Sequence, residues 1–325
     1  MVSGKRLTLL ASPPPVVDVV VLTHDSRELV LDCLARLGDP AIERLIVVDN
    51  ASSDGTEQAI REAFPDVHVV RLDEHGGISR GYNEGAAAGS AEYILFLNDD
   101  ILADDGSVSA LLEELGANPR VASAGGRLLN PGERTTQLQY NPHRFPTPLS
   151  LGTMLSGVEQ LWPANPWSGD HLRHPADERR SQIVDQPAGA ALMVRRAVFE
   201  AIGGWDTGYW FWFEDVDLSR RLAEQGEALF VPRATFEHLG GATVGRWTRA
   251  DALERFYHGI LRYAAKFFSP PQRVAFALAL IAFALPRILV FTLLRRPELA
   301  RLQRTVARAA LALMRGRAPV LAGRS

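Results

Sequence analysis

The sequence has 325 residues, of which 46% are apolar and 22% are charged, and its formal net charge is −3. This composition is typical of a folded globular protein and excludes disorder for the bulk of the chain. The length allows one large α/β domain with an appended segment, or two small domains. The single cysteine, Cys33, excludes an internal disulfide and favours a reducing compartment, and its apolar neighbours predict a core position.

The first hundred residues alternate short apolar runs with helical segments. Strands are predicted at residues 16–22, 45–48, 67–72 and 93–97, and helices up to Leu37, from Ser53 to Phe64 and over residues 77–88. Near-continuous apolar runs mark strands that are buried on both faces, so the alternation predicts a doubly wound α/β sheet. Ligands of such sheets bind beyond the carboxyl ends of the strands, where Asp49 and Asp100 fall.

The middle of the chain has no clear period. Residues 130–186 scatter Pro, Trp and polar side chains, which predicts a loop-rich insertion that could form an acceptor-binding surface. Regular patterns return with a strand at 188–194 and a helix to Ile202. A helix follows five consecutive aromatic residues at 209–213, and a short strand is predicted at 228–231.

Two acidic groups carry chemistry in this pattern. Asp99 and Asp100 follow a buried strand, where carboxylates could hold a divalent cation against a diphosphate, although acidic turns are also common in loops. Glu214, Asp215 and Asp217 open a helix beside large apolar side chains. Three acids in four positions exceed what the helix dipole requires, and burial would raise the basicity of a carboxylate. One of them could therefore act as a general base.

Two further features are weaker on their own. The segment 76–89 contains five glycines around Arg80 and Asn83, which would let backbone approach a phosphate, or would simply allow tight packing of a helix on the sheet. Its spacing matches neither the dinucleotide-binding nor the P-loop pattern. His238 is followed by two glycines and, taken alone, a histidine is more often structural than a ligand.

Taken together and in order, these segments resemble the family 2 glycosyltransferases of the GT-A fold, particularly their rhamnosyltransferase-like branch. The resemblance extends from about Val16 to Lys266. Its pieces are VVVLTH at 19–24, VVDNASSDGT at 47–56, GGISRGYNEG at 76–85, LNDD at 97–100, GGWD at 203–206, EDVDL at 214–218, and His238. Asn98 departs from a strict D-x-D motif, and His24 stands where an Asn is common in the family.

The resemblance implies a role for each matching residue. Thr23 would line the nucleotide pocket and Asp49 would accept a hydrogen bond from a uracil or thymine base. Arg80, Asn83 and Asp99 would lie on the ribose and diphosphate side. Asp100 and His238 would bind Mg²⁺ or Mn²⁺. Asp215 would be the catalytic base, supported by Glu214 and Asp217. A single base with no obvious nucleophile implies inversion at the anomeric carbon.

The resemblance also divides the chain and suggests substrates. We expect a tail at 1–15, a GT-A domain at 16–268 with a nucleotide-binding half (16–129) and an acceptor-binding half (130–268), and helices at 269–325. The branch favours dTDP-L-rhamnose as donor, with a UDP-hexose or UDP-galactofuranose as the alternative. The acceptor would be a glycan or a polyprenyl-diphosphate-linked sugar used in cell-envelope polysaccharide synthesis.

The C-terminal region predicts a membrane partner. From Arg287 to the end the chain carries nine Arg and one Glu. The run 274–285 is apolar, and Pro286 and Arg287 interrupt it before a second apolar run, which favours an interfacial or re-entrant segment over a clean span. Leu299, Leu302, Val306, Ala310 and Leu313 then recur at helical spacing between arginines. We therefore expect this helix to lie on the cytoplasmic face of an anionic membrane, and expect no nucleic-acid partner. The alternative is that both segments pack on the body of the protein as ordinary helices with a solvated basic face.

Other classes are disfavoured by specific residues. An oxidoreductase or a sugar nucleotidyltransferase on a similar sheet would need a glycine-rich turn near the N-terminus, and residues 23–26 contain no glycine. An inactive membrane-bound scaffold would have no reason to retain Asp100, Asp215 and His238.

Overall fold

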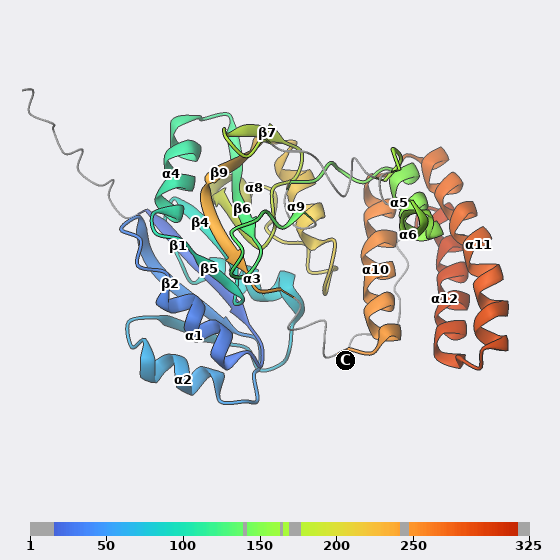
Figure 1. Ribbon diagram of the computed structural model, residues 1–325, viewed down its shortest axis with the longest axis horizontal. Coiled ribbons are helices and arrows are strands. Elements are labelled where there is room, and N and C mark those ends of the chain that lie inside the picture. The colour runs from blue at the N-terminus through green and yellow to red at the C-terminus, as the bar shows by residue number, and fades with distance from the viewer. Residues whose placement is uncertain (1–15, 139–141, 163–164, 169–176, 241–246, 318–325) are drawn as a thin grey trace, which may run out of the picture.

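The computed structural model describes residues 16–138, 142–162, 165–168, 177–240 and 247–317. The tail predicted at 1–15 therefore lies outside the described residues. Figure 1 shows a sheet with covering helices at one end of the molecule and a group of helices at the other, with α10 between them.

The first half of the sheet is parallel, as predicted. Four strands lie in the order β3-β2-β1-β4 and are connected by helices. The strands are β1 (Val17–Thr23), β2 (Ile42–Asp49), β3 (His68–Arg71) and β4 (Tyr93–Asn98). The helices are α1 (Arg27–Ala35), α2 (Thr56–Ala63) and α3 (Gly77–Ala87). Cys33 is fully buried in the core of this half, as expected.

The second half of the sheet is mixed. β8 (Ala191–Arg195) pairs antiparallel with both β4 and β6 (Val121–Leu129). β9 (Glu227–His238) pairs parallel with β6. β5 (Ile101–Ala103) and β7 (Gln182–Val184) pair antiparallel with β9 and complete the nine-stranded sheet of the described chain. The predicted α/β class is confirmed, and the mixed half explains why only the first strands showed a regular strand–helix alternation.

β9 is much longer than the strand predicted at 228–231. Val231 pairs with Gly126 and Thr235 pairs with the next residue of β6, Arg127, so three residues of β9 bulge out between them. Pro232 stands first in this bulge and has no N–H to donate to a ladder. The strand then resumes and carries His238 to the edge of the sheet.

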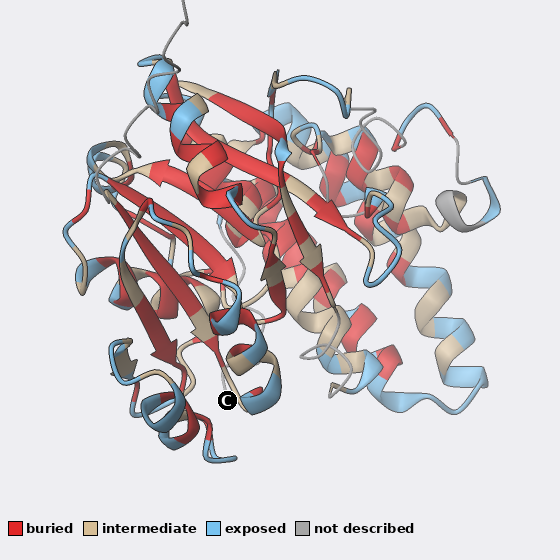
Figure 2. Cartoon of the chain, turned by 60° about the vertical axis from the view of Figure 1, so that its left-hand side comes forward, coloured by how far each residue is buried: buried red, intermediate tan, exposed pale blue. Residues whose placement is uncertain are grey.

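Helices fill the rest of the molecule. The segment predicted to be loop-rich contains α5 and α6 as well as β7. The helices are α4 (Ser107–Ala117), α5 (Pro148–Ser156), α6 (Val158–Leu161), α8 (Arg196–Ala201), α9 (Glu214–Leu222), α10 (Arg249–Phe267), α11 (Pro270–Leu293) and α12 (Pro297–Met314). As Figure 2 shows, most of the strands are largely buried, whereas part of the C-terminal helices is exposed.

One apolar core joins the C-terminal helices to the sheet side of the molecule. Its side chains come from α5, the turn before α9, and α10, α11 and α12, so it crosses the boundary predicted at residue 268. The amphipathic helix expected at the C-terminus is present as α12. Its apolar side packs on α10 and α11 and is not presented to solvent, which changes the expected membrane contact. The buried positions are Leu299, Leu302, Val306, Ala310 and Leu313.

Candidate active site

Asp100 and His238, predicted as metal ligands, lie side by side. The antiparallel pairing of β5 with β9 sets Ile101 opposite His238, which places Asp100 next to the histidine ring. Asp100 Oδ1 is 3.5 Å from His238 Nε2. The backbone N–H of Gly240 donates to Asp100 Oδ2 at 3.1 Å, and the N–H of Leu239 donates to the Asp100 carbonyl at 3.0 Å. Strand register therefore brings together two side chains that are far apart in the sequence.

Gln137 orients the His238 ring. Its side-chain N–H donates to the His238 carbonyl at 2.7 Å, so its amide oxygen is the atom that lies 2.9 Å from His238 Nδ1. An amide oxygen only accepts, and Nδ1 must therefore carry the proton. Burial lowers the pKa of His238, against the opposite effect of Asp100, which favours the neutral ring. A neutral ring protonated at Nδ1 presents its Nε2 lone pair to the carboxylate of Asp100.

This arrangement fits a divalent cation that is shared with a substrate. The ring nitrogen Nε2 and the buried carboxylate oxygen Oδ1 face each other, and both are atom types that bind divalent cations. Across the described residues, no three His, Cys, Asp or Glu side chains are grouped as a metal site would require. Asp100 and His238 could bind a cation together with a diphosphate, as is usual for Mg²⁺ bound with phosphates.

Asp99 lies beside this pair, as its sequence position requires. Burial raises the pKa of Asp99 to about 7, and the neighbouring Asp100 adds to the rise. Adjacent carboxylates resist ionising together when no cation is bound. A cation bound at Asp100 would therefore favour the ionised form of Asp99.

Glu214 and Asp215 follow a strained turn. Trp212 and Phe213 have φ angles of 64° and 69°, a region that bulky residues rarely adopt and that is found mostly at functional sites. Gly259 of α10 permits this turn, because a Cβ at that position would lie 2.7 Å from the carbonyl oxygen of Trp212. The start of α9 is thus held in place by direct contact with the backbone of α10.

The two carboxylates differ in their surroundings. Glu214 is buried, and burial together with the neighbouring Asp215 raises its pKa to about 8. Asp215 is half-buried, and burial raises its pKa as well. Gln186 donates to Asp215 Oδ2 at 3.3 Å, and a Cβ at Gly189 would lie 2.6 Å from Asp215 Cβ. Asp215 is therefore the more accessible of two carboxylates of raised basicity.

Asp217 belongs to a buried ionic cluster. Arg221 Nε donates to Asp217 Oδ2 and Lys266 Nζ donates to Oδ1, both at 2.6 Å, and the side chain is fully buried. Lys266 and Arg262 of α10 also bind Asp206, and these contacts lower the pKa of Asp206 to about 2 despite its partial burial. The structure therefore places Asp217 between α9 and α10, where it anchors the helix that begins with Glu214 and Asp215.

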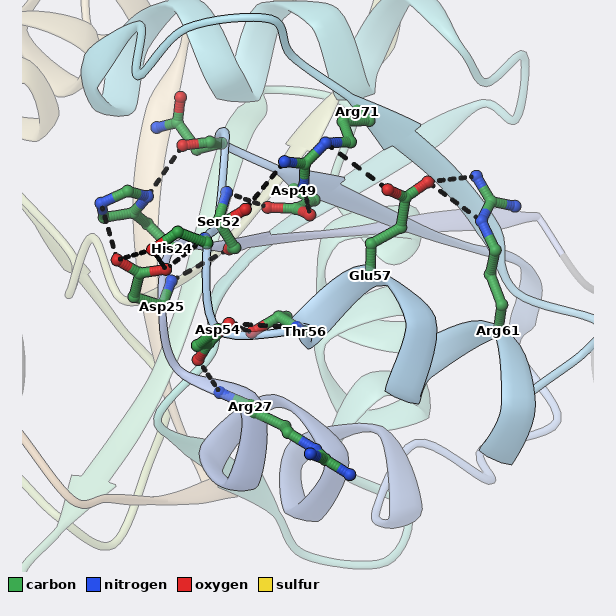
Figure 3. Close-up of polar contacts among 12 residues, drawn as sticks. His24, Asp25, Arg27, Asp49, Ser52, Asp54, Thr56, Glu57, Arg61 and Arg71 are labelled. Atoms are coloured by element: carbon green, nitrogen blue, oxygen red, sulfur yellow. Dashed lines mark hydrogen bonds and ion pairs between the residues drawn. The ribbon is translucent and has the colours of Figure 1, made fainter.

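Thr23 and Asp49 lie opposite each other at the carboxyl ends of β1 and β2. Figure 3 shows Asp49 between Ser52, whose N–H donates to Oδ1 at 2.8 Å, and Arg71, which forms an ion pair with Oδ2. Arg71 also donates to the Ser52 carbonyl at 2.7 Å and lies 3.5 Å from Glu57. Asp49 is fully buried, so the carboxylate predicted to contact a base also holds the loop that follows β2.

Arg80 and Asn83 occupy the glycine-rich helix α3 but are not brought to Asp100. Arg80 forms an exposed ion pair with Glu74 at 2.9 Å. The amide of Asn83 accepts from the backbone N–H of Trp205 at 2.9 Å and donates to its carbonyl at 2.8 Å. Asn83 thus holds the loop before α9, and its predicted contact with the donor remains a prediction.

An aromatic column connects the loop after β1 with the turn before α9. The His75 ring lies edge-on to His24 at 4.1 Å and stacks on Trp210 at 4.6 Å between ring centroids. The Arg255 guanidinium lies 3.9 Å above the Trp210 ring. The sequence pattern identified the aromatic run at 209–213 but not the residues that stack on it, since His75 and Arg255 match no motif.

Comparison with known proteins identifies the family. The family model described as "Glycosyl transferase family 2" matches residues 18–203, and that described as "N-terminal domain of galactosyltransferase" matches residues 178–242. The chain belongs to glycosyltransferase family 2. The enzyme class and the family predicted from the sequence motifs are thereby confirmed.

Relatives of this glycosyltransferase point the same way. The chain is 30% identical over 225 residues to an N-acetylglucosaminyl-diphospho-decaprenol L-rhamnosyltransferase of Mycobacterium tuberculosis, covering 65% of this chain and 71% of the relative. GalNAc-T7, solved with UDP, GalNAc and Mn²⁺, superposes with a TM-score of 0.54 at 16% identity, over 78% of this chain and 51% of that one. A mannosyltransferase of Pyrobaculum calidifontis, solved with GDP-Man and Mn²⁺, gives 0.51 at 17% identity, over 93% and 86%. These two structures confirm the GT-A fold.

Proposed function

We propose that this glycosyltransferase transfers L-rhamnose from dTDP-L-rhamnose to a sugar carried on a polyprenyl diphosphate, with inversion and with a divalent cation. The observation that carries the proposal is the pairing of Asp100 with a His238 ring whose Nε2 faces it, on the same sheet whose strand ends carry Thr23 and Asp49. The donor and acceptor are suggested by the rhamnosyltransferase of Mycobacterium tuberculosis. The transfer would take place at the cytoplasmic face of the membrane, where such an acceptor would be exposed.

In this mechanism Asp215 is the general base. Its carboxylate takes the proton of an acceptor hydroxyl while that oxygen attacks the anomeric carbon, and the bond from this carbon to the diphosphate oxygen breaks. One displacement inverts the anomeric carbon and releases dTDP. Burial raises the pKa of Asp215, and Asp215 in turn raises the pKa of Glu214, since two adjacent carboxylates do not ionise together readily. Asp217 holds α9 in position through Lys266 and Arg221.

Asp100 and His238 would hold the cation, and Asp99 would respond to its charge. When bound, a divalent cation neutralises the charge that develops on the diphosphate as the sugar leaves. Asp49 would accept a hydrogen bond from the base, with Arg71 and Ser52 fixing its orientation. Replacing Asp49 with Ala should weaken binding of dTDP by about tenfold or more, since a hydrogen bond to a charged group contributes roughly 1.5–3 kcal/mol.

The test is transfer by the purified full chain to a GlcNAc-diphospho-polyprenol, with dTDP-L-rhamnose, UDP-glucose, UDP-galactose and UDP-galactofuranose offered separately. We expect turnover with dTDP-L-rhamnose, its loss in EDTA, its recovery with Mg²⁺ or Mn²⁺, and an inverted anomer by NMR. Turnover with a UDP-sugar and not with dTDP-L-rhamnose would show that the UDP-sugar is the donor. A retained anomer would overturn the mechanism, and inactivity with every donor would favour a scaffold.

A further inference from the structure

α11 carries an exposed stripe of apolar side chains along most of its length. The stripe consists of Leu278, Ala282, Leu285, Leu289 and Leu293, with Pro286, Val290 and Leu294 beside it. Positions three and four residues apart share one face of a helix, so these side chains form a continuous surface. The helix buries only Phe276, Ala277, Leu280 and Ala284. Figure 1 shows α11 at the end of the molecule farthest from the sheet.

Arg287 does not interrupt this surface. Its guanidinium donates to the carbonyl oxygen of Leu155, at the end of α5, at 2.5 Å, and approaches the Tyr257 hydroxyl of α10 at 3.4 Å. Pro286 does not end the helix, which continues to Leu293. The Arg287 side chain, which interrupts the apolar run in the sequence, thus points toward the protein interior. The outward face of α11 keeps no charged side chain between Leu278 and Leu294.

Cationic side chains border the stripe at one end. Arg295 and Arg296 are exposed in the turn that follows its last leucines, and α12 exposes Arg301, Arg304 and Arg308. Elsewhere on the surface Leu161 and Trp162, at the end of α6, are 90% and 50% exposed. An apolar surface with adjacent arginines matches the chemistry of an anionic bilayer interface.

α11 alone is long enough to cross a membrane. Among the described helices it is the one whose length and apolar composition would permit a span, and its 24 residues extend about 36 Å. However, α12 packs along α11. If α11 crossed the membrane, the three exposed arginines of α12 would be drawn into the hydrocarbon layer with it. Each Arg near the bilayer centre is disfavoured by roughly a hundredfold. The packing therefore favours a helix pair that lies along the interface.

We propose that the exposed stripe of α11 is a membrane-binding surface that lies in the interfacial layer of an anionic bilayer, parallel to it. This surface deepens the proposed function and rests on it, because a lipid-linked acceptor would reach the enzyme at that interface. α10 packs on α12 and also supports the turn before Asp215, so the same helix connects the membrane-binding surface with the proposed base.

The test is flotation of the full chain with phosphatidylglycerol–phosphatidylcholine vesicles and with phosphatidylcholine vesicles alone. We expect the wild type to float with the anionic vesicles and to be released by alkaline carbonate. Leu285→Glu with Leu289→Glu should lower bound protein at least tenfold. Arg295→Gln with Arg296→Gln should lower it by roughly fivefold per charge on anionic vesicles only. Ile183→Glu, which alters a half-exposed apolar side chain on β7, is the matched control and should bind as the wild type does.

Three results would overturn this surface. The first is equal flotation of the double-glutamate variant and the wild type, with thermal melting showing both to be folded. It would show that the stripe does not bind the membrane. Resistance of the wild type to carbonate would show that α11 spans. The third result would be a wild type that dimerises without lipid, a double-glutamate variant that is monomeric, and no vesicle binding by either protein. In that case a second copy of the chain covers the stripe. Transfer measured in detergent separates the proposals: transfer without flotation rejects the surface alone, and flotation without transfer rejects the function alone.

Discussion

The Asp100–His238 pair and the Glu214–Asp215 pair are built in different ways. Strand register between β5 and β9 creates the first, and Gln137, from the segment after β6, orients its ring through hydrogen bonds. A strained turn creates the second, and α10 supports that turn through Gly259 and through Lys266. The proposed cation site thus depends on the sheet, whereas the proposed base depends on the C-terminal helices. Variants that separate these dependencies test the comparison.

The largest effect is expected at the cation site. Asp100→Ala removes the carboxylate that faces His238, and a bound cation contributes several kcal/mol to charge stabilisation, so transfer should fall by about 10³-fold or more. Melting temperature and far-UV circular dichroism should stay close to the wild type. Asp105→Ala, an exposed acid of the same segment, is the control. Full turnover in the presence of a chelator would contradict the assignment.

The next effect is expected at the base. Asp215→Asn keeps the shape of the side chain but removes the proton acceptor, so kcat should fall by roughly 10²–10⁴-fold while the donor KM stays nearly unchanged. In the wild type, activity should decline with falling pH at higher pH than for an ordinary aspartate, since burial raises the pKa of Asp215 and the base must be ionised. If Glu214→Gln proves the more damaging substitution, Glu214 is the base.

A smaller effect should come from the support of α10. Gly259→Ala places a Cβ against the carbonyl oxygen of Trp212 and displaces the turn before Glu214, so kcat should fall by about tenfold. Binding of the cation and of dTDP should not change, because the sheet is untouched. Gly152→Ala in α5 is the matched control, since nothing lies within 4 Å of the added Cβ. Weaker cation binding by Gly259→Ala would show that the two sites are not independent.

The smallest effect concerns stability. The folded pKa of Glu214 is about 8, well above the ordinary 4.5, because of burial and Asp215. Between these values the unfolded chain loses the proton first, so wild-type stability declines as pH rises. The glutamine of Glu214→Gln cannot titrate. The melting temperature of this variant should therefore rise relative to that of the wild type between pH 5 and pH 8.5. The gain should exceed that of Glu224→Gln, an exposed carboxylate just after α9. A constant difference across this range would refute the raised pKa.

The sequence predicted the elements that depend on local pattern. β1, β2 and β4 each contain a short apolar run, and α3 and α9 begin close to where their residues indicate. It predicted β9 too short, because Pro232 and Arg233 break the apolar run within the strand. It identified Asp100 and His238 through family motifs, but their proximity depends on a pairing between distant strands that no local pattern contains.

The supporting residues show the same limit. Gln137 lies in a segment without period, and the glycine at 259 reads as a weak point in a helix until the turn beside it is known. The mid-helix Arg287 favoured an interfacial or re-entrant segment over a clean span, and only its contact with the Leu155 carbonyl shows that it points inward. Local periodicity describes which face of a helix is apolar, but it does not say whether protein or lipid covers that face.

The bulge in β9 also separates the position of His238 from the length of the strand before it. Val231 pairs with Gly126 and Thr235 pairs with Arg127, and the three residues between them are not paired with β6. The face on which the imidazole lies is set after the bulge, by the pairing of Ile101 with His238. A change of length confined to the bulge would therefore leave this pairing intact, whereas a one-residue slip after Thr235 would turn the imidazole to the opposite face of the sheet, away from Asp100.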